Sequence, residues 1–347
     1  MKPVCLFFLC ILNLAVFTPP SIAETPTDII DLSFWKITLP TDDNGDGKVD
    51  EVSVGGLRDY IHPDYFYVDE DGFVVFSAPN RAATTSGSTN TRSELRQMFR
   101  GTNTSIGTHD LKNNFAIRAH NKARRHADIG GQLEATLRVM QVAERAKYPN
   151  RNSAFSVVVG QIHALKNKSQ LKKGFGYGNE PLKIFYKKWP NHETGSVFWT
   201  YERNLERDDP ERKDIAFPVW GNSWDVDEDP GEEGIALGEL FNYNVNVHEN
   251  IMYLTFRTRD PARTKTFQVD LSESIDDKDN PNGYAGDSFY FKAGAYNQCS
   301  TVDSDSFRYP ACLGTGDWQV DKENGDYTSV AFRRITLARG VDPNSKK

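Results

Sequence analysis

Polar and apolar residues alternate one by one in many short segments of this chain, and this pattern constrains its fold more than any other feature. Successive side chains of a β-strand point to opposite faces, so a period of two is typical of a strand. No long segment follows the helical period, and the sequence therefore predicts an all-β protein. The expected strands are 73–77, 93–99, 114–120, 132–142, 154–163, 182–187, 196–202, 239–247, 251–257, 264–269, 287–298 and 329–338.

The spacing of these strands indicates how they pair and pack. Residues 248–250 separate two of them at hairpin length, so the strands on either side are expected to pair antiparallel. Many short strands with few helices are typical of a sandwich or jelly roll, in which two sheets pack face to face. No repeat and no linker rich in Pro, Gly or Ser divides residues 24–347, so we expect one domain there.

Long polar segments connect the strands and are predicted as loops. They are residues 121–130, 166–179, 203–233 and 300–326. Within the third, residues 225–233 form a strongly acidic run, which we interpret as a solvated loop. A lid over a binding surface is the alternative, because long loops in compact domains are often functional.

The first residues predict an export signal. Lys2 gives a positive start, an apolar run follows from Val4 to Phe17, and small residues around Ala23 resemble a signal-peptide cleavage site. We therefore expect residues 1–23 to be removed and the mature chain to be secreted and extracellular. No later run is apolar enough to predict a membrane-spanning helix.

Two cysteines, Cys299 and Cys312, remain after removal of the signal. A pair of cysteines in an oxidising compartment predicts one disulfide that closes a short loop, with two free thiols as the alternative. Asn103 and Asn167 each begin an Asn-x-Ser/Thr sequence, which matters only in a host that glycosylates.

The chain carries a formal net charge of −7 at neutral pH. This balance argues against a general binder of nucleic acid or of anionic membranes, since such proteins carry a basic excess. An anionic substrate stays open, because a local basic patch can sit on an acidic protein. We expect a monomer.

One acidic stretch resembles a calcium-binding loop. Its oxygen-bearing side chains are Asp42, Asn44, Asp46 and Asp50. A complete loop carries a bidentate carboxylate at its twelfth position, which is Ser53 here. Ordinary turns are also rich in Asp, Asn and Gly, so a structural calcium ion is the less favoured interpretation.

Three strands carry polar residues on one face. In the segment 290–298 these residues are Tyr290, Lys292, Tyr296 and Gln298, with Gly294 among them. In the segment 92–96 they are Arg92, Glu94 and Arg96, and in the segment 161–163 they are Gln161 and His163. Arg is suited to gripping a carboxylate with paired donors, and Glu94 could orient such an Arg. Each stretch taken alone also fits a solvated strand, a surface salt-bridge ladder or a structural histidine.

Taken together, the three stretches R-S-E-L-R, Q-I-H and Y-F-K-A-G-A-Y-N-Q resemble the signature motifs of the alginate lyases of polysaccharide lyase family 7. The similarity extends from W-K-I-T-L-P at residues 35–40 to the strand near Leu337. The resemblance implies a β-jelly roll whose concave sheet forms a groove for the polymer alginate. It also implies eliminative cleavage of linked uronic acids without a catalytic metal or other cofactor.

The resemblance also implies roles for individual residues. Arg92 and Gln161 would bind the substrate carboxylate, His163 and Tyr296 would form the acid/base pair, and Lys292 and Gln298 would contact the polymer. Glu94, Arg96 and Tyr290 share the same strand faces and complete the expected substrate contacts. Ile162, in the middle of Q-I-H, resembles enzymes that accept guluronate-containing blocks, whereas Val there accompanies a mannuronate preference.

The chemistry of elimination agrees with these residue types. Removing the proton beside a uronate carboxylate builds negative charge, which donors already in place must neutralise. A base takes the C5 proton, and an acid protonates the leaving oxygen. A free tyrosine ionises with a pKa of about 10, so it needs cationic neighbours such as Lys292. We expect Tyr296 to be the acid and, for at least one uronate epimer, the base, with His163 as base or stabiliser for the other.

Other functions remain open from the sequence. A glycoside hydrolase would need two carboxylic acids across the groove, and Glu94 and Glu134 are the nearest strand carboxylates. A noncatalytic polysaccharide-binding module would use the same groove without turnover. A lyase for another polyuronate, such as glucuronan, would use the same carboxylate chemistry.

Overall fold

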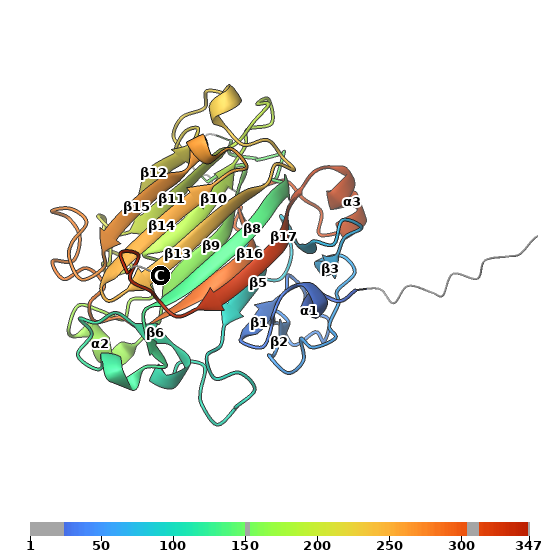
Figure 1. The fold of residues 1–347 in the computed structure, drawn as a ribbon. Helices are drawn as coiled ribbons and strands as arrows, with labels where there is room; N and C mark the ends of the chain where they lie inside the picture. Colours follow the sequence, from blue (N-terminus) through green and yellow to red (C-terminus); the bar gives the residue numbers. More distant parts are fainter. Residues whose placement is uncertain (1–23, 150–152, 304–311, 346–347) are drawn as a thin grey trace, which may run out of the picture.

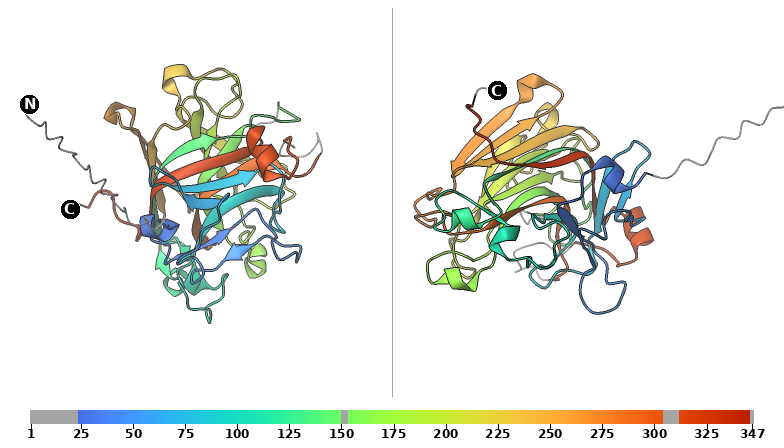
Figure 2. Two further views of the ribbon diagram at one scale, coloured as in Figure 1. Left: turned by 90° about the vertical axis from the view of Figure 1, so that its right-hand side faces the viewer. Right: turned by 60° about the horizontal axis from the view of Figure 1, so that its bottom comes forward.

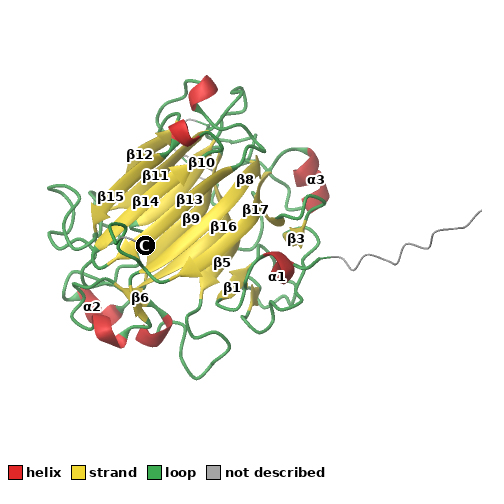
Figure 3. Cartoon of the chain, viewed as in Figure 1, coloured by secondary structure: helices red, strands yellow, loops and turns green. Residues whose placement is uncertain are grey.

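Two β-sheets pack face to face in the computed structural model of this chain (Figure 1). The structure describes residues 24–149, 153–303 and 312–345. The export signal predicted for residues 1–23 lies outside the described residues. Figure 3 shows that strands fill the middle of the molecule and that the short helices lie in the surrounding connections.

The first sheet has ten strands and carries the candidate site. Its main path is β12 (Asp214–Trp220), β11 (Ser196–Glu202), β10 (Leu182–Lys187), β9 (Ser156–Ala164), β16 (Phe289–Ser300), β5 (Asn90–Gln97), β1 (Trp35–Thr38) and β2 (Glu51–Val52). β6 (Phe115–Ala116) pairs with the start of β16, and β7 (Asp128–Ile129) pairs with β6. All pairs along the main path are antiparallel.

The second sheet has seven antiparallel strands. They run in the order β15 (Lys265–Asp270), β14 (Ile251–Arg257), β13 (Phe241–His248), β8 (Gly131–Gln141), β17 (Tyr327–Ala338), β4 (Val74–Pro79) and β3 (Phe66–Val68). The described helices are α1 (Pro26–Ile29), α2 (Lys168–Leu171) and α3 (Trp318–Glu323), with single 3-10 turns at 111–113, 123–125, 231–233 and 261–263. The views in Figure 2 show that the connecting segments gather around the ends of the strands. The predicted all-β jelly roll and the predicted hairpin of β13 with β14 are confirmed.

The two sheets differ in how their outer faces are covered. In β8 the core-facing residues Leu133 and Leu137 alternate with half-buried Glu134 and Thr136, as the period of two predicts. In β10 and β11, by contrast, every residue is buried. Part of the outer face of the ten-stranded sheet therefore lies beneath other segments of the chain.

Several elements differ from those expected, and two of the differences, at β12 and β6, concern the ten-stranded sheet next to the site. Residues 214–220 were expected within a loop but form β12, an edge strand that pairs with β11. Pro218 interrupts the strand pattern there, and an edge strand tolerates proline because one side of it makes no ladder bonds. Residues 114–120 were expected as a strand, yet only Phe115–Ala116 pair, because the chain turns directly afterwards, with the His120 N–H donating to the Ile117 carbonyl.

The predicted disulfide is confirmed. Cys299 and Cys312 are bonded, are both buried, and lie thirteen residues apart in the sequence. Cys299 is the next-to-last residue of β16, so the disulfide fixes the chain as it leaves the strand that carries Tyr296.

The acidic loop at 42–50 uses its carboxylates within a turn. Asp42 accepts hydrogen bonds from the backbone N–H groups of Asp46 and Gly47, each at 3.0 Å, and Asp50 accepts one from Asp43 at 2.9 Å. Over the described ranges, no group of three or more His, Cys, Asp or Glu side chains is arranged to hold a metal ion. None of the helices in the same ranges has the length and apolar character needed to cross a membrane.

Candidate active site

The fold makes neighbours of the three strands that carry the polar stretches. β16 lies between β9 and β5 in the ten-stranded sheet. Lys292 lies opposite both Gln161 and Arg96, and Tyr296 lies opposite Arg92. Their side chains occupy the outer face of the sheet, because the intervening residues of β16, such as Ala293, belong to the core.

A buried carboxylate, Glu94, lies at the centre of this group. It accepts a hydrogen bond from Nη1 of Arg92 at 3.1 Å, and it also contacts Nε2 of Gln161 and Nζ of Lys292. Burial lowers the pKa of Lys292 to about 8, although the negative charge of Glu94 opposes this shift. The Glu94 carboxylate thus holds side chains from three strands. Removing one partner of a buried ion pair leaves an uncompensated buried charge, which strongly destabilises the fold.

Arg92 also faces the Tyr296 phenol ring. Its guanidinium carbon lies 3.9 Å from the ring centre, and Nζ of Lys292 lies 5.7 Å from that centre. The Ser88 hydroxyl lies 3.2 Å from the phenol oxygen. Two cationic side chains thus lie beside the phenol. Ser88 precedes β5 in a segment without a regular pattern, so this contact could not be predicted from the sequence.

His163 is held from two sides. Its Nδ1 donates to the Ala164 carbonyl at 2.7 Å, and its Nε2 lies 3.0 Å from a Glu180 oxygen. Its ring stacks on Tyr290 with centres 5.2 Å apart and planes 11° from parallel. Burial raises the pKa of Tyr290 to about 12. The pair Tyr290–His163 lies beside the pair Lys292–Gln161 along the same two strands.

Glu180 is a site residue that sequence reasoning missed. It lies in the segment before β10 and contacts both His163 and Lys183. Partial burial favours its neutral form, but Lys183 and His163 outweigh this effect and hold the pKa of the carboxyl well below its usual range. Glu180 is therefore an ionised partner for the histidine.

A second buried cluster of charged residues extends the site along β10, β11 and β12. Nζ of Lys183 lies 2.7 Å from Asp214 and 3.9 Å from Glu202. Glu202 also pairs with Arg212 at 2.8 Å. Burial raises the pKa of Glu202 to about 8, and the nearby carboxylates Glu180 and Asp214 add to this shift.

Two residues expected to contact the substrate, Arg96 and Gln298, instead form hydrogen bonds with other groups of the protein. The Arg96 guanidinium lies 4.0 Å above the Tyr290 ring and donates to Thr108 and Asn114, which ties the segment after β5 to the sheet. Gln298 is buried and donates to the backbone carbonyl of Tyr296 at 3.2 Å. The pairing of β16 with β5 is irregular between Tyr296 and Ser300, so the predicted alternation ends before Gln298.

Glu134, the second carboxylate that a glycoside hydrolase would use, does not lie near Glu94. Glu134 belongs to β8 in the seven-stranded sheet and lies 3.6 Å from Arg334. Glu94 lies on the other sheet, on the face that points away from the core. The two carboxylates therefore do not face one another across a binding surface, as a glycoside hydrolase requires.

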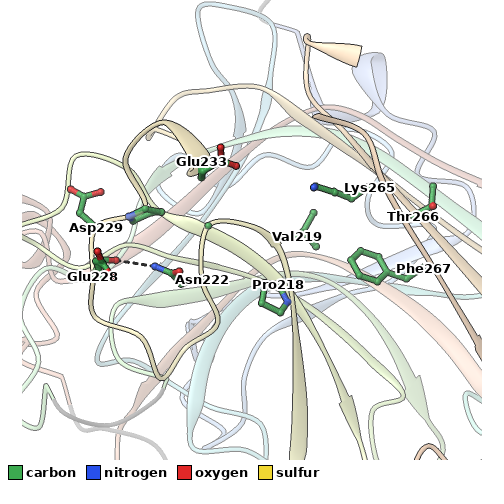
Figure 4. Close-up of a pocket in the computed structure, with 11 residues that line it drawn as sticks. Pro218, Val219, Asn222, Glu228, Asp229, Glu233, Lys265, Thr266 and Phe267 are labelled. Atoms are coloured by element: carbon green, nitrogen blue, oxygen red, sulfur yellow. Dashed lines mark hydrogen bonds between the residues drawn. The ribbon is translucent and has the colours of Figure 1, made fainter. Parts of the chain in front are cut away.

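The most voluminous of the cavities described lies outside this site. It measures about 630 Å³ and is formed between residues of β12, β15 and the acidic segment between β12 and β13 (Figure 4). Glu228, Asp229 and Glu233 line it together with Lys265. This acidic lining does not suit a polyanion, so we assign the chemistry to the cluster around Glu94.

Comparisons with known proteins identify the family of this chain. A family profile described as alginate lyase matches residues 30–339. An alginate lyase from Klebsiella pneumoniae is 34% identical over 308 residues, which cover 85% of this chain and 92% of the relative.

Solved structures give the same result. The alginate lyase structure from Klebsiella pneumoniae superposes with a TM-score of 0.71 at 28% identity and covers 92% of this chain and 99% of that one. An exolytic alginate lyase of polysaccharide lyase family 7 from Zobellia galactanivorans gives a TM-score of 0.73 at 34% identity, with the same coverage of both chains. This chain therefore belongs to the alginate lyases of polysaccharide lyase family 7.

Proposed function

We propose that this protein is a secreted, monomeric lyase that cleaves linked mannuronate and guluronate in alginate by β-elimination and releases unsaturated oligouronates. The observation that carries the proposal is the convergence of Arg92, Gln161 and Lys292 on Glu94, beside Tyr296. This arrangement concentrates cationic and amide donors on one patch of an acidic protein, as a uronate carboxylate requires.

Arg92 and Gln161 bind the carboxylate of the reacting sugar in this proposal. Nη1 of Arg92 is bonded to Glu94, whereas its Nε is buried and has no hydrogen-bond partner among the described residues. A buried donor without a partner calls for an explanation, and a substrate carboxylate oxygen supplies one. Charge that develops on that carboxylate during proton removal is then met by donors already in position.

Tyr296 transfers the protons. As a phenolate it removes the C5 proton, and as a phenol it protonates the leaving glycosidic oxygen. Arg92 and Lys292 lie beside its ring, so negative charge on the phenol oxygen faces two cations during the reaction. His163 serves as a stabiliser, because both of its ring nitrogens face acceptors, namely the Ala164 carbonyl and Glu180.

The preference for guluronate-containing blocks is part of the proposal and rests on Ile162 in the middle of Q-I-H. Ile162 points into the core and is fully buried, so its effect on the substrate would pass through the positions of Gln161 and His163. Comparison of Ile162→Val with the natural chain on polyguluronate and polymannuronate tests this point. An unchanged ratio of the two rates would remove Ile162 as the determinant.

One assay tests the proposed activity. The protein is incubated with polyguluronate, polymannuronate and mixed alginate, and ultraviolet absorbance reports the conjugated double bond that elimination creates. Glucuronan is the matched substrate for the rival polyuronate lyase. Binding to alginate without any new absorbance would support a binding module instead. Mass spectrometry of protein recovered from the culture medium tests secretion, with a mature start at Glu24 expected.

A further inference from the structure

The segment 221–234 is the first part of the connection from β12 to β13, and it covers part of the outer face beside the candidate site. A row of neighbouring residues leads from Tyr296 to this covered part, since Tyr296 lies opposite Val158 and Val158 lies opposite Phe185. Phe185 in turn lies opposite Phe198 on β11. A polymer that crossed the strands from Tyr296 toward β12 would have to follow this row.

The row is apolar and closed. Phe185 and Phe198 point away from the core, yet they are only 1% and 0% exposed. Trp224 explains their burial, because its ring centre lies 5.3 Å from that of Phe185 and 5.7 Å from that of Phe198. Tyr296 packs against the same cluster. Trp224 thus covers the two phenylalanine rings edge-on, and this aromatic cover begins directly beside the proposed catalytic phenol.

The covering segment is hydrogen-bonded to the adjoining ends of β10 and β11 and to the loop between them. The hydrogen bonds run from Lys187 Nζ to the Trp224 carbonyl at 3.0 Å, from the Asn222 N–H to Ser196 Oγ at 2.8 Å, from His192 Nε2 to the Asp227 carbonyl at 2.8 Å, and from the Glu193 N–H to Asp229 at 2.7 Å. Because side-chain and backbone groups hold it along its length, the segment is a built part of this face.

A second row of residues crosses the sheet from Lys292 through Gln161 to Lys183. This row also offers no binding site for a uronate on the side of β12. Lys183 lies opposite Gln161, but its ammonium group is engaged by Asp214 and Glu180. Lys183 is 4% exposed. The covering segment itself carries the acidic run 225–233. A polyuronate entering this half of the sheet would therefore meet an aromatic cover, a neutralised lysine and net negative charge.

We propose that Trp224, held by the segment 221–234, closes the outer face on the side of β10 to β12, so that an alginate chain ends beside Tyr296 instead of running past it. The inference rests on the proposed lyase function and adds where on the polymer the enzyme cuts. It cuts close to a chain end and releases short unsaturated products from the first turnovers.

The test compares the full mature chain with Trp224→Ala and with the control Trp318→Ala. Trp318 is a half-buried tryptophan in α3 that packs on Tyr65. Double-bond absorbance, solution viscosity and chromatographic product size are followed on the same mixed alginate. For the natural chain and Trp318→Ala we expect short products and a slow fall in viscosity relative to double-bond release. For Trp224→Ala, at equal double-bond release, we expect at least a doubling of mean product length and a faster fall in viscosity.

A second variant guards against a local folding defect in Trp224→Ala. It replaces residues 223–229 by a Gly/Ser segment of equal length, and it should show the same shift in product size. Long products from the natural chain at early times would overturn the inference. The inference would also be overturned if Trp224→Ala and the Gly/Ser variant both fold and release products of the same size as the natural chain. Absence of any double bond with every alginate would instead overturn the proposed function.

Discussion

The Nε2 atom of His163 lies 3.0 Å from a carboxylate oxygen of Glu180, although Glu180 belongs to none of the three recognised sequence motifs. The carboxyl is held in its ionised form and accepts hydrogen bonds, and the Ala164 carbonyl accepts at Nδ1. Both ring nitrogens therefore face acceptors. In the proposed mechanism, Glu180 fixes the orientation of the ring, and Tyr296 removes the proton.

Glu180→Gln should lower kcat on every alginate block. A hydrogen bond to a charged group contributes about 1.5–3 kcal/mol, so the expected loss is about tenfold to hundredfold. Glu180→Asp should recover part of the rate, because it keeps the charge. The matched control is Glu206→Gln, at an exposed position in the same half of the chain. Equal rates for Glu180→Gln and the natural chain, measured by double-bond absorbance, would contradict the assignment.

Tyr296→Phe should abolish turnover while alginate still binds. General acid or base groups contribute about 10²- to 10⁴-fold to rate, and one residue carries both tasks here, so the loss should reach the upper end of this range. Isothermal calorimetry measures the retained binding. Tyr253→Phe, on the seven-stranded sheet, is the control and should keep full activity. A Tyr296→Phe enzyme with near-native kcat would exclude the phenol from the chemistry.

Arg92→Lys should reduce kcat/KM even though the positive charge is kept. Lysine lacks the Nε donor that is unpartnered in Arg92, and it cannot grip a carboxylate with paired donors. Loss of one charge-assisted hydrogen bond predicts a fall of about tenfold to hundredfold. Arg334→Lys on β17 serves as the control. Steady-state kinetics with native values for Arg92→Lys would show that charge alone suffices.

Activity should fall as the pH rises through about 8. Burial lowers the pKa of Lys292 to about 8, so its ammonium form prevails below that pH and the neutral amine above it. Above this pH the site loses one cation beside Glu94 and Tyr296, and binding of a polyuronate weakens. We expect KM for alginate to rise there. In Lys292→Gln this rise should be absent, and a rise that persists in the variant would assign it to another group.

Removal of the disulfide should lower stability more than activity. Disulfides contribute about 2–4 kcal/mol, largely by restricting the unfolded chain. The double variant Cys299→Ala with Cys312→Ala should therefore unfold at a lower temperature in a calorimetric scan. Turnover at low temperature should change little, because β16 is also held by β5 and β9. An unchanged unfolding temperature would indicate that the bond is dispensable.

The strands were predictable from the sequence where one period dominates. The bounds expected for 182–187, 196–202 and 251–257 agree with β10, β11 and β14. The alternation of polar and apolar residues did not predict β12, because Pro218 and the acidic residues on either side are typical of a loop. It also failed near Gln298, because irregular pairing between Tyr296 and Ser300 breaks the alternation.

The central part of the site was predictable because its residues lie on strands, where the alternation of the sequence shows which side chains share a face. Arg92, Glu94, Gln161, Lys292 and Tyr296 do come together. Glu180 and Trp224 could not be placed in this way, since both lie in loops. Only the folded positions of β9, β10 and the segment 221–234 bring them to the site.

The pairing of β9, β16 and β5 in the interior of one sheet has a practical consequence. The residues proposed for chemistry rest on hydrogen-bonded ladders, whereas the cover that limits the polymer rests on a loop between two other strands. The two can be altered separately. Engineers who want longer oligosaccharides from this scaffold can exchange the loop and leave the catalytic strands untouched.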